Sequence, residues 1–218
     1  MRPLSKHSRI IITVAIIAIG VAFLYYVPIT RPLFNLRFIS TPTATPDYSS
    51  WRSYTNQKYG ISLKYPSIYQ LVPGKSGLLA EWELYGLTNG VEIVSIDIPG
   101  STQIRTNFGD ATLRIGISNE STAIKQCLNP PDYSNTYQER IIGGLAFRKF
   151  IRSGVGAGNY YDFVSYRAIQ NGGCEVFEHV IHYSNIQNYP PEANRKEFDK
   201  NIVINSLESI LDTVQFIK

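Results

Sequence analysis

Two histidines three residues apart, His179 and His182, are the first candidates for chemistry in this chain. The zinc motif of helices needs a spacing of four residues and a glutamate, and neither is present here. The surrounding residues favour a β-strand, in which residues three apart point to opposite faces. We therefore expect two unrelated histidines and no metal site. The third histidine, His7, lies in the N-terminal segment.

A glycine-rich segment, with glycines at alternate positions from Gly154 to Gly158, is the second candidate. Phosphate-binding loops need G-x-G-x-x-G ahead of a helix, or GxxxxGK[ST]. Here the glycines precede aromatic residues and a predicted strand, which favours a flexible hairpin connection. The alternative is a binding loop, because glycine-rich loops beside exposed aromatic rings often contact ligands. Its candidate residues are Gly154, Gly156, Gly158, Tyr160, Tyr161 and Asp162.

Common catalytic signatures are missing from the sequence. It contains no G-x-S-x-G motif, which marks many serine hydrolases. Its 17 carboxylates include no pair whose placement across a cleft follows from sequence alone. The tyrosines fall mostly at alternate strand positions, which is typical of packing on a sheet face. We expect no catalytic residues and no cofactor.

An uncharged apolar run from Ile10 to Val27 precedes all of these candidates. Its length is about the minimum for a helix that crosses a hydrocarbon core of roughly 30 Å. The run is longer than a signal-peptide core and lacks a small-residue cleavage site, so we expect a retained anchor rather than a cleaved signal. The basic bias of its N-terminal flank predicts a single-pass protein of the cell membrane, with residues 1–9 in the cytoplasm and the C-terminal domain outside.

Charge is distributed unevenly along the chain. Five of the 21 Lys and Arg residues lie in residues 1–46, with none of the 17 Asp and Glu, so the remainder carries 16 basic and 17 acidic side chains. Nucleic-acid binding needs a clustered positive surface, which this balance does not provide. The basic excess therefore belongs to the membrane segment, and we expect no nucleic-acid partner.

Cys127 and Cys174 are the two cysteines of the chain. An even number of cysteines in an exported domain favours a disulfide, which is consistent with the oxidising side of a membrane. The alternative is two unpaired buried thiols.

The segment after the anchor has the composition of a spacer. Residues 28–50 are rich in Pro and Thr towards their end, which favours an extended stalk. Residues 51–218 are long enough for one domain with a substantial core. Runs of short strands with few helices predict the α+β class, with an antiparallel β-sheet and flanking helices.

Hairpin signals set the predicted elements of this domain. A turn at Gly143-Gly144 and another within 170–173 join two pairs of long strands. Residues 121–128 favour a short helix that begins at Asn119 or Ser121 as N-cap, and residues 202–211 carry one apolar stripe of a closing helix. The predicted strands are 51–55, 61–65, 78–85, 91–98, 112–117, 137–142, 145–151, 160–169, 175–183 and 214–217.

The segment from Tyr54 to Pro66, with its aromatic-Gly turn and Tyr-Pro ending, resembles the opening of PsbP-like domains. The segment from Leu207 to Phe216 resembles the end of these domains, where a helix returns into a last strand. The anchor, the stalk and the single domain are similar to the plan of membrane-anchored bacterial PsbP-related proteins. The resemblance implies an α/β/α sandwich over residues 51–218. It does not imply a photosystem role, and no metal-binding residue carries over from the family.

Three functions follow as hypotheses. The first is a non-catalytic interaction or accessory module of the cell envelope, whose partner is an envelope protein or a cell-wall polymer. The second is an envelope enzyme, such as a hydrolase of wall polymer or lipid, which predicts a cleft with polar groups of shifted pKa. The third is a ligand-sensing ectodomain that acts with a separate signalling partner.

Overall fold

The computed structural model describes residues 47–74, 90–129 and 137–217. The predicted anchor at 10–27, the N-terminal part of the stalk and the predicted strand at 78–85 lie outside these ranges. Among the described residues, no helix combines the length and the apolar character that a membrane crossing needs. The described part is mostly antiparallel β-sheet with few helices, which confirms the α+β class.

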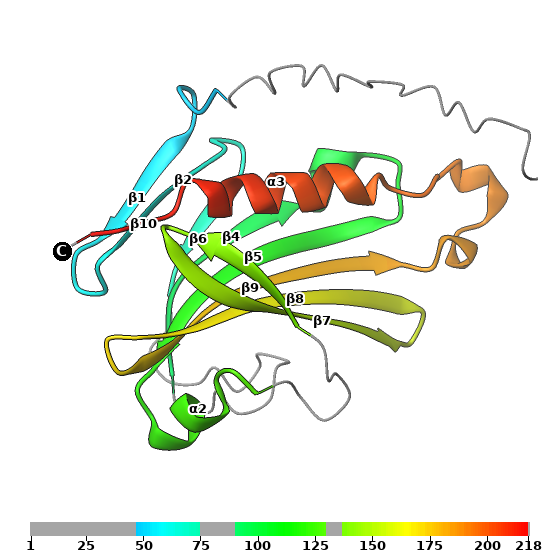
Figure 1. Cartoon of the computed structure of the whole chain (residues 1–218). Helices are drawn as coiled ribbons and strands as arrows, with labels where there is room; N and C mark the ends of the chain where they lie inside the picture. The colour runs from blue at the N-terminus through cyan, green and yellow to red at the C-terminus, as the bar shows by residue number, and fades with distance from the viewer. Residues whose placement is uncertain (1–46, 75–89, 130–136, 218) are drawn as a thin grey trace, which may run out of the picture. The chain divides into compact units, whose positions relative to one another are not determined.

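A small sheet joins the first hairpin to the end of the chain. Strands β1 (Arg52–Asn56) and β2 (Ile61–Tyr65) pair antiparallel, as their alternation predicts. The closing strand β10 (Gln215–Phe216) pairs with the other edge of β2. Ile61, Leu63 and Tyr65 point into the core. Figure 1 shows β1, β2 and β10 at one end of the molecule.

In the described part of the chain, the large sheet has seven antiparallel strands in the order β3-β4-β5-β9-β8-β7-β6. The long strand β9 lies in its middle and pairs with β5 on one side and with β8 on the other. The sequence did not predict β3. The strands are β3 (Gln70–Pro73), β4 (Val91–Pro99), β5 (Phe108–Ser118), β6 (Gln138–Ile142), β7 (Leu145–Gly156), β8 (Asn159–Gln170) and β9 (Gly173–Ser184).

Two-residue turns join the long strands where the sequence predicts them. Gly143 and Gly144 turn β6 into β7 with φ angles of 56° and 85°, and Asn171 and Gly172 turn β8 into β9 with φ angles of 49° and 77°. Two successive residues with positive φ match the twist of an antiparallel hairpin, which explains the glycines at these positions.

The C-terminal helix α3 (Lys200–Asp212) packs on one face of the large sheet (Figure 1). Asp199 caps it, since its side chain accepts hydrogen bonds from the backbone N–H groups of Asn201 and Ile202. The apolar stripe of α3 lies in the main core: Val203, Leu207, Ile210 and Leu211 are all buried. The face of the sheet beneath α3 is called the helix face below.

The second helix, α2 (Ser121–Gln126), packs against β9 on the opposite face, where Ala123 lies in a small cluster with Cys127, Cys174 and Val176. Its predicted cap is wrong: Glu120 precedes the helix, and no side chain caps it. Three 3-10 turns complete the described elements: η1 (Gly100–Gln103), η2 (Ile186–Asn188) and η3 (Pro191–Ala193).

Candidate functional site

The candidate glycines and tyrosines form a tight hairpin instead of a flexible loop. Gly154 and Gly156 lie within β7, and only Ala157 and Gly158 form the turn into β8. The turn is held from outside: the backbone N–H of Asn185 and the side-chain amide of Asn188 both donate to the carbonyl oxygen of Gly158, at 2.8 and 2.9 Å. The hairpin therefore presents its side chains from a fixed backbone.

Strand alternation divides the candidate residues between the two faces of the sheet. Tyr160 and Asp162 lie on the helix face, where the Tyr160 ring stacks on Tyr183 with 5.2 Å between centroids. Asp162 accepts a hydrogen bond from Ser153 Oγ at 2.7 Å and pairs with Lys200 Nζ at 2.5 Å. Tyr161 lies on the other face. The six residues therefore do not form one binding surface.

On the face away from α3, Tyr161 belongs to a row of polar and aromatic side chains. Its ring stacks on His182 with 4.7 Å between centroids. The Nδ1 atom of His182 lies 3.2 Å from Asp110 Oδ2, and its Nε2 atom lies 3.2 Å from Asn159 Oδ1. Gly109 makes room for this ring, because a Cβ atom there would lie 2.7 Å from Nδ1. His182 is thus held on both ring nitrogens.

The Asp110–His182 pair has the carboxylate–imidazole order of an acid–base dyad. Nucleophilic catalysis would need a hydroxyl or thiol at Nε2, the ring nitrogen that does not face Asp110. In the described contacts that nitrogen faces Asn159 Oδ1, and Ser184 Oγ donates to the same oxygen at 3.2 Å. The arrangement orients His182 and Asn159, and it favours a binding or structural role over nucleophilic catalysis.

The other histidine, His179, lies on the helix face, as the three-residue spacing predicts. It is fully buried, and its Nδ1 atom lies 3.9 Å from Glu208 Oε1 on α3. Glu208 also accepts a hydrogen bond from the Tyr166 hydroxyl and forms an ion pair with Arg140. Arg140 in turn contacts Asp212 Oδ1 at 2.7 Å. Among the described residues, no group of three or more potential metal ligands is present.

Burial shifts the titration of this cluster. Desolvation, with Arg140 and Lys149 nearby, lowers the pKa of His179 to about 3, so its imidazole is neutral at physiological pH. Burial raises the pKa of the Tyr166 hydroxyl to about 12. Burial and the charge of Arg140 lower the pKa of Lys149. Sequence reasoning missed this cluster, because Arg140, Tyr166 and Glu208 come from three elements with no shared motif.

A second buried acid lies towards the small sheet. Burial raises the pKa of Glu175 to about 7, and its Oε2 atom has no hydrogen-bond partner among the described residues. A cavity of about 10 Å³ borders this carboxyl. That volume is close to the smallest that can hold one water molecule. Tyr59 and Ile61 of the small sheet contribute to its lining.

A groove of about 490 Å³ lies at the start of α3. Two apolar side chains that line it are unusually exposed: Ile104 is 80% exposed and Ile202 is 61% exposed. Polar residues complete the lining: Thr102, Gln103, Thr106, Lys196, Glu197 and Asp199. The two exposed apolar side chains within a polar rim make this groove a candidate interaction site.

Hydrogen bonds fix the backbone around the groove. The side-chain amide of Gln103 donates to the carbonyl oxygen of Asp199 at 3.1 Å and accepts from its N–H at 2.9 Å. Residue Arg105, next to Ile104, has a φ angle of 58°. A non-glycine residue in the left-handed region stores strain that the neighbouring contacts must hold. The reciprocal amide pair holds the η1 corner against the residue that caps α3.

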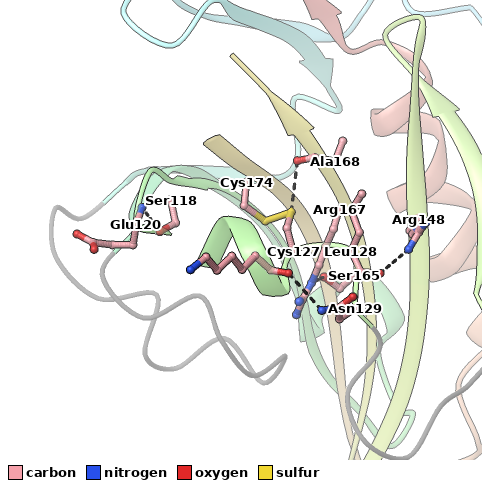
Figure 2. The surroundings of a disulfide bond; sticks show 11 residues. Ser118, Glu120, Cys127, Leu128, Asn129, Arg148, Ser165, Arg167, Ala168 and Cys174 are labelled. Atoms are coloured by element: carbon pink, nitrogen blue, oxygen red, sulfur yellow. Dashed lines mark hydrogen bonds between the residues drawn. A yellow bond between two sulfur atoms is a disulfide. The ribbon is translucent and has the colours of Figure 1, made fainter. Parts of the chain in front are cut away.

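The disulfide lies at the far end of β9 from the groove. Cys127 and Cys174 are bonded and completely buried, with 5.7 Å between their Cα atoms. Figure 2 shows the bridge joining the end of α2 to the sheet, beside the hydrogen bond from Arg148 Nη1 to the carbonyl oxygen of Leu128 at 2.6 Å. The pairing confirms the prediction from the cysteine count and indicates an extracytoplasmic domain.

Comparison with known proteins shows no matching family model and no matching curated protein. Solved structures that are similar to this chain include a Bacteroides thetaiotaomicron VPI-5482 protein, with a TM-score of 0.45 and 13% identity over 78% of this chain. The chain spans about half of that protein, 49% of its length. LpqN of Mycobacterium tuberculosis, described as involved in cell envelope biogenesis, has a TM-score of 0.33 and 12% identity over 72% of this chain and 83% of its own. The PsbP-like resemblance stays a prediction.

Proposed function

We propose that this chain is a membrane-tethered, extracytoplasmic module that binds another protein of the cell envelope without catalysis. The observation that carries the proposal is the groove at the start of α3, where Ile104 and Ile202 expose 80% and 61% of their surface. Burying two such side chains against a partner would contribute about 1.5–3 kcal/mol each. The polar rim would fix the partner's orientation through hydrogen bonds.

The location part of the proposal rests on two features. The buried Cys127–Cys174 disulfide is typical of an oxidising compartment. The predicted anchor at 10–27 would hold the domain at the outer surface of the membrane, with the predicted stalk and a PsbP-like sandwich following it. Tethering would allow even a weak interaction to form, because it raises the effective concentration of a partner in the same membrane.

The described contacts favour binding over an envelope hydrolase. Among the described residues, His179, Tyr166 and Glu175 have strongly shifted pKa values, and these three do not line the groove. Functional clefts of enzymes usually bring such groups to the surface at which substrate binds. The groove instead combines apolar side chains with ordinary polar residues, which suits a protein partner.

Site-specific photocrosslinking tests the proposal in intact cells. A photoreactive phenylalanine analogue at Ile104 or Ile202 should give the same crosslinked protein, since both positions line one groove. Ile169, which is 48% exposed at the opposite end of β8, is the matched control. Crosslinks of equal pattern at all three positions, or none at Ile104 and Ile202, would contradict the proposal.

A further inference from the structure

His182 belongs to a row of four residues that crosses the large sheet on the face away from α3. In the strand register, Asp110 of β5 pairs with His182 of β9, and His182 pairs with Tyr161 of β8. Tyr161 in turn pairs with Gly154 of β7. The side chain of His182 is 25% exposed, so its ring is accessible to solvent while its neighbours hold it.

Both ring nitrogens of His182 face oxygen atoms. Nδ1 lies 3.2 Å from the carboxylate oxygen Oδ2 of Asp110, and Nε2 lies 3.2 Å from the amide oxygen Oδ1 of Asn159. An ionised carboxylate can only accept hydrogen bonds, and so can an amide oxygen. A neutral imidazole has one N–H group, whereas the charged imidazolium has two. Only the charged ring can therefore donate to both oxygens.

The orientation of the Asn159 amide is set by its other contacts. Its Nδ2 atom donates to the carbonyl oxygen of Ala157 at 3.3 Å, and its Oδ1 atom accepts from Ser184 Oγ at 3.2 Å. If the amide turned by half a rotation, Oδ1 would face the Ala157 carbonyl oxygen, and two acceptors would oppose each other. The amide thus presents its oxygen to His182 as long as it holds the β7–β8 turn.

We propose that His182 is a proton-responsive clamp for this turn. In its charged form it donates to Asp110 and Asn159 together, and Asn159 keeps its hydrogen bond to Ala157. In its neutral form the remaining proton stays on Nδ1 beside Asp110, so Nε2 becomes an acceptor and the Asn159 amide turns to donate to it. The bond to Ala157 is then lost. Ala157 is sensitive to this loss, because its φ angle of 49° is costly for a residue with a side chain.

The groups around the ring suit its positive form. Among the described residues on this face, the carboxylate of Asp110 and the phenol of Tyr161 are the titratable groups beside His182. The Tyr161 ring stacks on the imidazole with 4.7 Å between centroids, and the face of an aromatic ring attracts a cation. Asp97 of β4 and Arg152 of β7 lie one row further along the same face. The nearest charge to the ring is therefore the negative charge of Asp110.

NMR of the histidine ring nitrogens in the full chain tests the clamp. At about pH 5.5 both nitrogens of His182 should carry a proton, and at about pH 8.5 only Nδ1 should. The side-chain amide of Asn159 and the backbone N–H of Gly158 should change their chemical shifts over the same pH range, because that amide holds the turn. His182→Gln identifies the ring signals and should abolish these changes.

A pair of variants separates the clamp from general electrostatics. Asn159→Asp replaces the amide with a carboxylate that can only accept, so His182 should keep both protons at an about tenfold lower proton concentration than in the parent. Gln215→Glu adds the same charge to the exposed first residue of β10 and should leave the ring unchanged. A singly protonated ring at about pH 5.5, or Asn159 and Gly158 signals that do not follow the ring in the parent chain, would overturn the proposal.

Discussion

Lys200 Nζ lies 2.5 Å from Asp162 Oδ2, so the first residue of α3 is tied to a strand of the β7–β8 hairpin. Ser153 Oγ donates to the other oxygen of the same carboxylate at 2.7 Å. Asp162 therefore joins β7, β8 and α3 at one point. This connection holds the start of α3 in place, and the groove with Ile104 and Ile202 depends on that position.

Removing the disulfide should destabilise the domain strongly. Cys127 and Cys174 are 47 residues apart, and a loop of that length gives about 4 kcal/mol in the chain-entropy model. The Cys127→Ala/Cys174→Ala variant should unfold at a markedly lower urea concentration than the parent chain under oxidising conditions. The parent with a reductant should resemble the variant. Identical unfolding midpoints in all three samples would mean that the bridge does not stabilise the fold.

Replacing Glu208 should weaken the packing of α3. Glu208→Ala leaves Arg140 and Tyr166 without their shared acceptor in a mostly buried site, at a cost of about 2–3 kcal/mol. Asp212 also pairs with Arg140 but is more exposed, with 58% of its side chain accessible. Asp212→Ala should therefore cost less than about 1 kcal/mol. Chemical denaturation measures both variants, and equal losses would contradict this account.

Glu175 should make stability fall as pH rises. Its pKa is about 7 in the folded protein and near 4.5 when unfolded, so the folded state retains a proton that the unfolded state loses. The contribution of this group is complete below pH 4.5 and is lost as pH rises to about 7, by up to about 3 kcal/mol. Glu175→Gln should be more stable than the parent at pH 8 and similar to it at pH 4.5. Denaturation at several pH values tests this, and a pH-independent difference would refute it.

His179 should act in the opposite direction. Its pKa falls to about 3 in the folded protein from an ordinary value of 6.5, so the unfolded state binds the extra proton. Stability from this group is complete above pH 6.5 and is lost as pH falls towards 3. His179→Gln should remove that loss while the Glu175 effect remains. If both variants change the same part of the pH profile, one of the two assignments is wrong.

The two glycines of the β6–β7 turn should differ in their tolerance of alanine. Both have positive φ angles, which cost about 1 kcal/mol for an alanine. A Cβ atom at Gly143 would also lie 2.7 Å from the ring of Phe216, whereas a Cβ atom at Gly144 would have no described atom within 4 Å. Gly143→Ala should therefore be clearly less stable in thermal unfolding than Gly144→Ala. Equal melting temperatures would show that Phe216 moves aside freely.

Local pattern was enough to predict much of the sheet. Alternating apolar residues at Ile61, Leu63 and Tyr65 and paired turn residues such as Gly143-Gly144 act within a few residues, so their strands and turns follow from sequence. The apolar stripe of α3 is equally local. The cap of α2 was mispredicted. Asn119 and Ser121 are residue types that favour the N-cap position, but Glu120 occupies that position in the structure.

The chain's own residues determined its class, its hairpins, its disulfide pair and the opposite orientation of His179 and His182, since each depends on short-range periodicity or on a count. Tertiary structure decided which distant residues meet. Asp110 reaches His182, Glu208 reaches Tyr166, and Ile104 and Ile202 line one groove only because the order of the strands and the path of α3 bring them together. No local pattern encodes those contacts, because their energy comes from packing between elements that are far apart along the chain.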